Sequence, residues 1–193
     1  YFTGLRSRFN MKDDLHIFSQ LNEKSLSIAM DISRKGGNNK IVFTSVGKDA
    51  GFLADRARKI NAMMTKKSIR SFKLNGHLTN KKLFLYFIET EEKNNVKDAI
   101  DKYKKINGFK RDTVLYVFST QESMERVVDV CNDEKGAGHV RLEFFNEAQR
   151  TAYNLVFDHP IFNTENKRDV TNIMILGAGQ YGLEIAKAIS WCS

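Results

Sequence analysis

Short apolar runs alternate with helical patterns along most of this chain. The runs are rich in Ile, Val, Phe and Tyr, and turn-forming Asn, Gly and Lys clusters separate them. The runs predict strands at 15–19, 41–46, 69–74, 83–89, 114–119 and 140–145. Apolar residues at helical spacing predict helices at 22–34, 50–63, 92–105, 121–132 and 146–157.

This alternation predicts a doubly wound α/β fold with a mostly parallel, Rossmann-like sheet. Strands that are apolar on both faces are typical of a parallel sheet covered by helices on both sides. One pair departs from the pattern, because strands 69–74 and 83–89 are joined only by 75–82, which is too short for a crossover helix. These two form a hairpin, or the first is an edge strand followed by a tight loop.

Composition excludes several classes of protein. The longest apolar runs, such as 83–88, fall far short of the roughly 20 residues that span a bilayer. Two cysteines, Cys131 and Cys192, cannot build a disulfide scaffold or a metal cluster, and they fit a reducing cytoplasm. The net charge of +8 is compatible with an anionic partner, which could be nucleic acid, a phosphate-bearing ligand or an anionic membrane surface. Its spread along the chain favours a solvated surface over a dedicated nucleic-acid face.

In a doubly wound fold, ligands bind beyond the carboxyl ends of the strands. Small polar residues stand at these ends, among them Ser19, Gln20, Thr44, Ser45 and Thr90. Such residues either cap the following helices or contact a ligand, and the sequence leaves both interpretations open.

The sharpest motif lies near the end of the sequence. A short apolar strand at 172–176 precedes Gly177, Gly179 and Gly182 in a G-x-G-x-x-G pattern, and a helical pattern follows. Here the first glycine permits a tight turn, the second lets a pyrophosphate approach bare backbone, and the third lets the helix pack closely on the strand. We therefore expect these glycines, with Gln180 and Tyr181, to bind NAD or another nucleotide.

The first strand and helix show the same framework without the glycines. Gln20, Asn22 and Ser25 align with the three glycines in turn. The match is either a chance similarity or a degenerate nucleotide-binding loop. The second strand ends in Thr44 and Ser45 rather than the acid that NAD requires, so ordinary NAD binding by this first unit is disfavoured. Lys48, which follows this strand, either contacts a phosphate-bearing ligand or is a solvated surface lysine.

These patterns predict three parts: a leader at 1–14, a Rossmann-like domain at 15–168, and the start of a second Rossmann unit at 169–193. The acid that follows the glycines by ~20 residues in nucleotide-binding units would fall beyond Ser193. We expect the sequence to be part of a longer protein, since it begins with Tyr1 and ends within a helical pattern.

The glycine motif with its helix, at 173–189, together with the βαβ pattern of 15–145, resembles the RCK (regulator of potassium conductance) and Trk-type NAD-binding family. The resemblance covers most of the chain by pattern and about 17 residues by motif, and the first unit departs from it at Gln20, Asn22 and Ser25. It implies a cytoplasmic Rossmann domain that regulates a potassium channel or transporter. It also implies tandem domains that associate in pairs, hence a homo-oligomer, and a membrane partner.

The leading hypothesis is a regulatory domain that binds a nucleotide and is not an enzyme. No residue stands out as catalytic, because the four histidines are scattered and no Ser/His/Asp, Cys/His or metal-ligand pattern occurs. The alternative is a fragment of an NAD(P)-dependent oxidoreductase whose catalytic part lies elsewhere. Nucleic-acid binding through the basic surface, a third class, would weaken steeply with salt.

Overall fold

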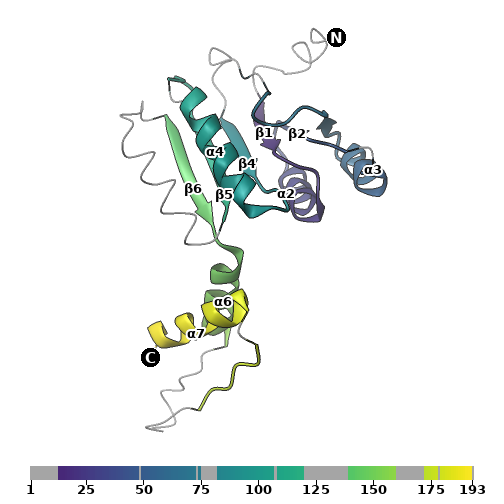
Figure 1. The fold of residues 1–193 in the computed structure, drawn as a ribbon. Helices are drawn as coiled ribbons and strands as arrows, with labels where there is room; N and C mark the ends of the chain where they lie inside the picture. Colours follow the sequence, from purple (N-terminus) through teal and green to yellow (C-terminus); the bar gives the residue numbers. More distant parts are fainter. Residues whose placement is uncertain are drawn as a thin grey trace. The chain divides into compact units, whose positions relative to one another are not determined.

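A computed structural model describes residues 13–47, 49–72, 74, 82–106, 108–119, 139–159, 172–177 and 179–192. The described residues form an α/β protein (Figure 1), which confirms the predicted fold class. Its strands are β1 (Asp14–Phe18), β2 (Asn39–Phe43), β3 (Met63–Met64), β4 (Leu83–Phe87), β5 (Thr113–Phe118) and β6 (Val140–Phe145). Its helices are α2 (Glu23–Arg34), α3 (Gly51–Lys59), α4 (Glu92–Ile106), α6 (Glu147–Asp158) and α7 (Gln180–Cys192).

The six strands form one sheet in the order β3-β2-β1-β4-β5-β6. The β1 strand pairs in parallel with β2 on one side and with β4 on the other, and the pairs β2–β3 and β4–β5 are parallel as well. This is the strand order of a Rossmann fold, in which the direction of winding reverses between the first and fourth strands.

Apolar side chains cover both faces of the sheet. On one face, Leu26 and Ala29 of α2 and Ala54 and Ala57 of α3 pack against the strands. On the other face, α4 contributes a buried stripe of Val96, Ala99, Tyr103 and Ile106. Burial on both faces explains why the strands are continuously apolar in sequence, as a parallel sheet requires.

The chain divides into two compact units between Phe144 and Phe145. Unit 1 holds strands β1 to β5, most of β6, and helices α2 to α4. Unit 2 holds α6 and α7, which pack against each other through Ala152, Val156 and Ala188. No described helix has the length and apolar character needed to cross a membrane.

The predicted strand at 69–74 is wrong. Its described residues, 69–72 and 74, form turns, and the third strand is instead Met63–Met64. The predicted helix at 50–63 ends early, at Lys59, and Asn61 takes a positive φ of 55° before the chain enters β3 beside Val42 and Phe43. Ile69 and Phe72 are buried against one face of the sheet. This burial requires apolar side chains, and from sequence alone the apolar run resembles a strand.

The other strands and helices predicted within unit 1, and the helix predicted at 146–157, hold to within a few residues where they are described. The helix predicted at 146–157 is α6, which Asn146 begins by accepting a 3.1 Å hydrogen bond from the Gln149 N–H. The helix predicted at 121–132 and Cys131 lie outside the described residues.

A histidine is buried in the centre of the sheet. His16 on β1 stacks on Phe84 at 4.6 Å between ring centres, and its Nδ1 lies 3.0 Å from the Tyr86 hydroxyl. Its Nε2 lies 3.3 Å from the Asn39 side-chain oxygen. Burial lowers the pKa of His16 below its ordinary value of 6.5, against smaller opposing effects of Asn39 and Asp14.

The lowered pKa of His16 predicts loss of stability in acid. Below pH 6.5 the unfolded chain takes up a proton that the folded chain resists, so the free energy of unfolding falls as the pH drops towards the folded-state pKa. We expect His16→Gln to flatten this dependence between pH 7 and pH 5, as measured by urea unfolding at each pH. An unchanged difference in stability between the two pH values in the variant would contradict this assignment.

Candidate functional site

The carboxyl ends of β1 and β4 lie side by side where the strand order reverses. Rossmann folds bind dinucleotides in the crevice at this position. The candidate residues Gln20, Asn22 and Ser25 follow β1 here, and Thr90 follows β4.

In unit 1 the protein's own side chains bridge the two strand ends. The Ser19 hydroxyl accepts a 3.0 Å hydrogen bond from the Ile88 N–H, and the Asn22 amide donates to the Ile88 carbonyl at 2.7 Å. The Gln20 side-chain oxygen accepts from both the Thr90 N–H at 3.0 Å and the Thr90 hydroxyl at 3.2 Å. We call these contacts of Ser19, Gln20, Asn22, Ile88 and Thr90 the switch-point bridge.

The N-terminus of α2 is also occupied. The Asn22 side-chain oxygen accepts from the Ser25 N–H at 2.9 Å, and the Ser25 hydroxyl accepts from the Asn22 N–H at 2.9 Å, which completes a capping box. Ser25 is fully buried. The Ser25 N–H is therefore used internally, whereas a phosphate-binding helix presents such groups to its ligand. Asn22 is therefore the N-cap of α2.

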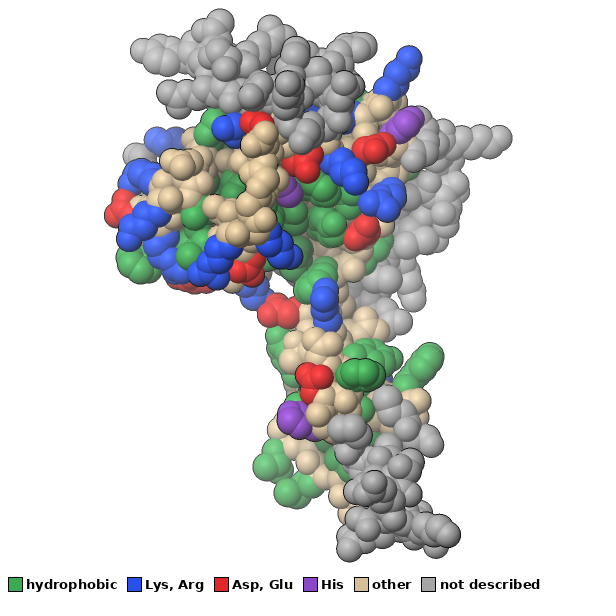
Figure 2. All heavy atoms as spheres, turned by 180° about the vertical axis from the view of Figure 1, so that it is seen from behind, with side chains coloured by type: hydrophobic (Ala, Val, Ile, Leu, Met, Phe, Trp, Pro, Cys, Tyr) green, Lys and Arg blue, Asp and Glu red, His purple; other side chains and the backbone are tan. Residues whose placement is uncertain are grey.

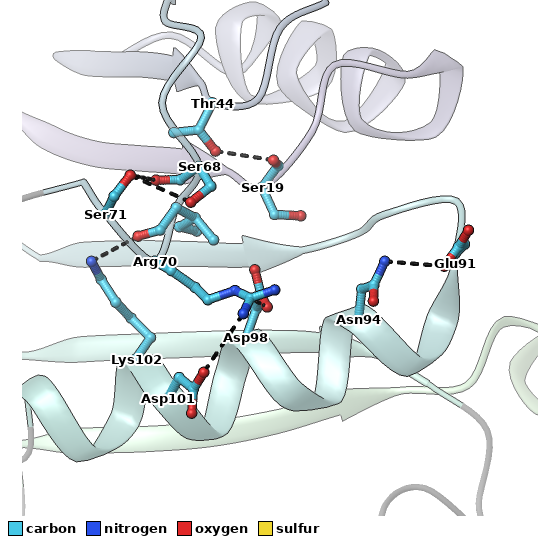
Figure 3. A network of polar contacts seen from close by, with 11 residues as sticks. Ser19, Thr44, Ser68, Arg70, Ser71, Glu91, Asn94, Asp98, Asp101 and Lys102 are labelled. Atoms are coloured by element: carbon cyan, nitrogen blue, oxygen red, sulfur yellow. Dashed lines mark hydrogen bonds and ion pairs between the residues drawn. The ribbon is translucent and has the colours of Figure 1, made fainter.

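Thr44 and Ser45 face the protein as well. Thr44 is buried, and its hydroxyl donates to the Phe18 carbonyl at 2.8 Å and lies 3.0 Å from the Ser19 carbonyl (Figure 3). Ser45 has a positive φ of 52°, and its N–H donates to the Lys67 carbonyl at 2.9 Å. The end of β2 is thus joined to β1 and to the loop that follows β3. Lys48 lies outside the described residues.

Helix α4 joins the next two strand ends. Asn95 is buried, and its side-chain oxygen accepts from the Glu89 N–H at 2.5 Å while its amide donates to the Phe118 carbonyl at 2.9 Å. Glu89 itself is half-buried after β4, and burial, with a smaller contribution from Asp98, raises the pKa of its carboxyl.

Two further polar residues of α4 hold the loop that replaces the predicted third strand. The buried Lys102 ammonium donates to the Ile69 carbonyl at 2.8 Å and to the Phe72 carbonyl at 2.6 Å. Burial, assisted by Lys105, lowers the pKa of Lys102 to about 8. Arg70 extends from the loop to α4, where its Nε lies 2.5 Å from the buried Asp98 carboxylate, and Asp101 flanks it (Figure 3).

Sequence reasoning missed these α4 contacts. The available signal was the spacing of Asn95, Asp98 and Lys102, which fall on the same inward stripe as Ala99 and Ile106. A polar residue on an apolar stripe has to be hydrogen-bonded or ion-paired in the fold. Among the residues that the structure describes, no group of three or more His, Cys, Asp or Glu could hold a metal ion.

The glycine loop of unit 2 is shaped by backbone contacts, unlike the loop after β1, which is held by side-chain hydrogen bonds. Gly177 has a φ of +110°, a conformation that other residues rarely adopt. A Cβ atom at Gly182 would lie 2.1 Å from the Gly177 carbonyl oxygen, so only glycine lets α7 approach the loop this closely. A Cβ atom at Gly179 would meet nothing within 4 Å. Gly179 is therefore exposed, and the space that its side chain would fill is open.

The remaining candidate residues of unit 2 flank this loop. Gln180 begins α7, the Leu183 N–H donates to the Gly179 carbonyl at 3.0 Å, and Tyr181 is 46% exposed. The segment at 172–176 was predicted as a strand. It has no sheet partner among the described residues, and it is exposed, with Leu176 at 86%. The strand prediction is wrong for this structure, because no described strand lies beside this segment to form sheet hydrogen bonds with it.

Comparison of the chain with protein-family models, with curated proteins and with solved structures finds no match.

The switch-point bridge predicts a cost for removing Asn22. We expect Asn22→Ala to lower the free energy of unfolding by about 2 kcal/mol, since it removes a helix cap and leaves the Ile88 carbonyl without its amide donor. Urea unfolding measures this difference. Ser27→Ala, on the exposed side of the same helix, is the matched control and should change stability little. Equal effects of the two substitutions would contradict a bridging role for Asn22.

The two glycines of unit 2 predict opposite structural outcomes for the same substitution. Gly182→Ala places a methyl group against the Gly177 carbonyl and should displace α7, which exposes α7 amides to hydrogen exchange. Gly179→Ala meets open space and should leave the exchange pattern unchanged. Similar protection of α7 in both variants would overturn the close approach of Gly182 to Gly177.

Proposed function

We propose that this chain is a regulatory Rossmann-type module whose glycine loop in unit 2 binds the phosphates of a nucleotide, with NAD as the first candidate. One observation carries the proposal: Gly177 and Gly182 fix the bend before α7, while Gly179 leaves bare backbone facing outward. Backbone N–H groups at such a bend, together with the positive end of the helix dipole, favour a phosphate.

Unit 1 contributes structure rather than a second nucleotide site. Its Rossmann strand order supplies the crevice, and the switch-point bridge fills that crevice with internal hydrogen bonds. A nucleotide entering there would have to break contacts of both Gln20 and Asn22 and would meet side chains where the pyrophosphate requires backbone.

The regulatory part of the proposal rests on the resemblance to the RCK and Trk-type family. In that role the nucleotide changes the conformation of unit 2, and the change reaches a potassium channel or transporter in the same or another chain. A ligand can shift such an equilibrium only by its differential affinity for the two conformations. Cytoplasmic location and assembly into a homo-oligomer belong to the same proposal.

The test is binding of NAD, NADH, ATP and ADP to the full chain, by thermal shift and by isothermal titration calorimetry. We expect at least one of these nucleotides to stabilise the folded protein, by about 2.7 kcal/mol at a concentration 100-fold above its Kd. Gly179→Ala should abolish this stabilisation, because its methyl group occupies the space that the phosphate needs.

Two control variants locate the site. Gly108→Ala, at an open position of unit 1, is a matched glycine substitution and should leave binding unchanged. Gln20→Ala should also leave it unchanged, because the bridge of unit 1 is not the proposed site. The proposal fails if no nucleotide binds, or if binding persists in Gly179→Ala and disappears in Gln20→Ala.

A further inference from the structure

Half of the net charge of this protein lies on one short stretch of unit 1. Residues 51–67, which comprise α3, β3 and the start of the next loop, hold five basic residues and one acidic residue, a net +4 out of the chain's +8. Figure 2 shows Lys and Arg side chains gathered on the side of unit 1 where α3 lies. The sequence expectation of evenly spread charge therefore misses a local concentration. We define the α3 surface as Phe52, Arg56, Arg58, Lys59, Lys66 and Lys67.

An exposed aromatic side chain stands within this basic surface. Helix α3 buries Ala54 and Ala57 against the sheet, and Phe52 and Lys59 are exposed, while the half-buried Arg56 reaches towards α2. Phe52 is 72% exposed, and the Arg56 guanidinium lies 5.6 Å from the centre of its ring. Nothing in the core of unit 1 requires a phenylalanine at this position.

Nearby acids offset only part of the charge. Asp55 forms an ion pair with Arg58, and Glu23 of α2 lies 3.0 Å from Arg56. The Arg58–Asp55 pair is largely exposed and the Arg56–Glu23 pair is partly exposed, so both contribute little to stability and are screened by salt. Lys59, Lys66 and Lys67 are exposed as well, and the α3 surface keeps a net positive charge when Asp55 and Glu23 are counted against its basic residues.

We propose that the α3 surface binds an anionic lipid membrane. Lysine is depleted from the centres of protein–protein interfaces, which disfavours a protein partner for this lysine-rich surface. Anionic lipids attract Lys and Arg side chains near the membrane surface, and an exposed phenylalanine between cations can enter the headgroup region. The surface consists of one short helix and the start of a loop, with one apolar anchor, and its binding is therefore weak and reversible.

The test uses vesicles and the full chain. Sedimentation with vesicles of phosphatidylcholine containing 30% phosphatidylserine should capture the protein, capture by pure phosphatidylcholine vesicles should be at least tenfold weaker, and capture should fall as salt rises from 50 to 300 mM. The double variant Lys59→Glu with Lys66→Glu should weaken capture at least tenfold. Its matched control is Lys97→Glu with Lys104→Glu, two exposed lysines of α4, which should retain most of the binding.

Fluorescence tests the apolar anchor separately. In a Trp191→Phe background, Phe52→Trp should shift its emission to shorter wavelength when phosphatidylserine vesicles are added, since the ring leaves water. An unshifted emission, equal loss of capture in the two double variants, or absence of capture would each overturn the proposal. Binding to a double-stranded oligonucleotide without binding to vesicles would also overturn it and would assign the surface to nucleic acid. Nucleotide binding at unit 2 has its own readout, so these outcomes are independent of the proposed function.

Discussion

Buried backbone groups at the ends of parallel strands must find hydrogen-bond partners, and this requirement organises unit 1. The strands stop at the carboxyl edge of the sheet, where their last amides and carbonyls have no neighbouring strand to bond. In many doubly wound proteins a ligand or ordered water satisfies such groups. Here short polar side chains do so at each junction from β2 to β5: Thr44, Ser19, Gln20, Asn22 and Asn95.

The loop before α2 and the loop before α7 treat the free N–H groups of their helices in different ways. Both place a turn before a helix, and both leave helix N–H groups to be satisfied. Unit 1 uses Asn22 and Ser25 as an internal cap, which satisfies the first helix N–H groups with protein side chains. Unit 2 uses Gly177 and Gly182 to bring backbone close to backbone and leaves Gly179 bare. A helix N-terminus that is capped by the protein itself suits a rigid scaffold, and a loop with uncovered backbone suits a phosphate ligand.

Much of the fold follows from sequence pattern, and the errors have a common cause. Apolar runs identify β1, β2, β4 and β5 because a strand buried on both faces lacks polar alternation, whereas β6 does alternate, with exposed Arg141 and Glu143. The same rule misplaces the third strand, since Ile69 and Phe72 are apolar for burial beneath a loop. A run of hydrophobic residues indicates that a segment is buried, but it does not indicate whether the backbone of that segment is extended or turned.

The sequence by itself determined the alternation of strands and helices, the parallel sheet, and the glycine motif, because each depends on local spacing and side-chain size. Only the tertiary structure decided what the polar residues at the strand ends do. Gln20 and Thr90 are 70 positions apart, as are His16 and Tyr86. Contacts of that separation depend on strand order and register, which local pattern does not encode. Packing likewise buried Lys102 against the Ile69 and Phe72 carbonyls, because folding brings together in space residues that the sequence keeps about 30 positions apart.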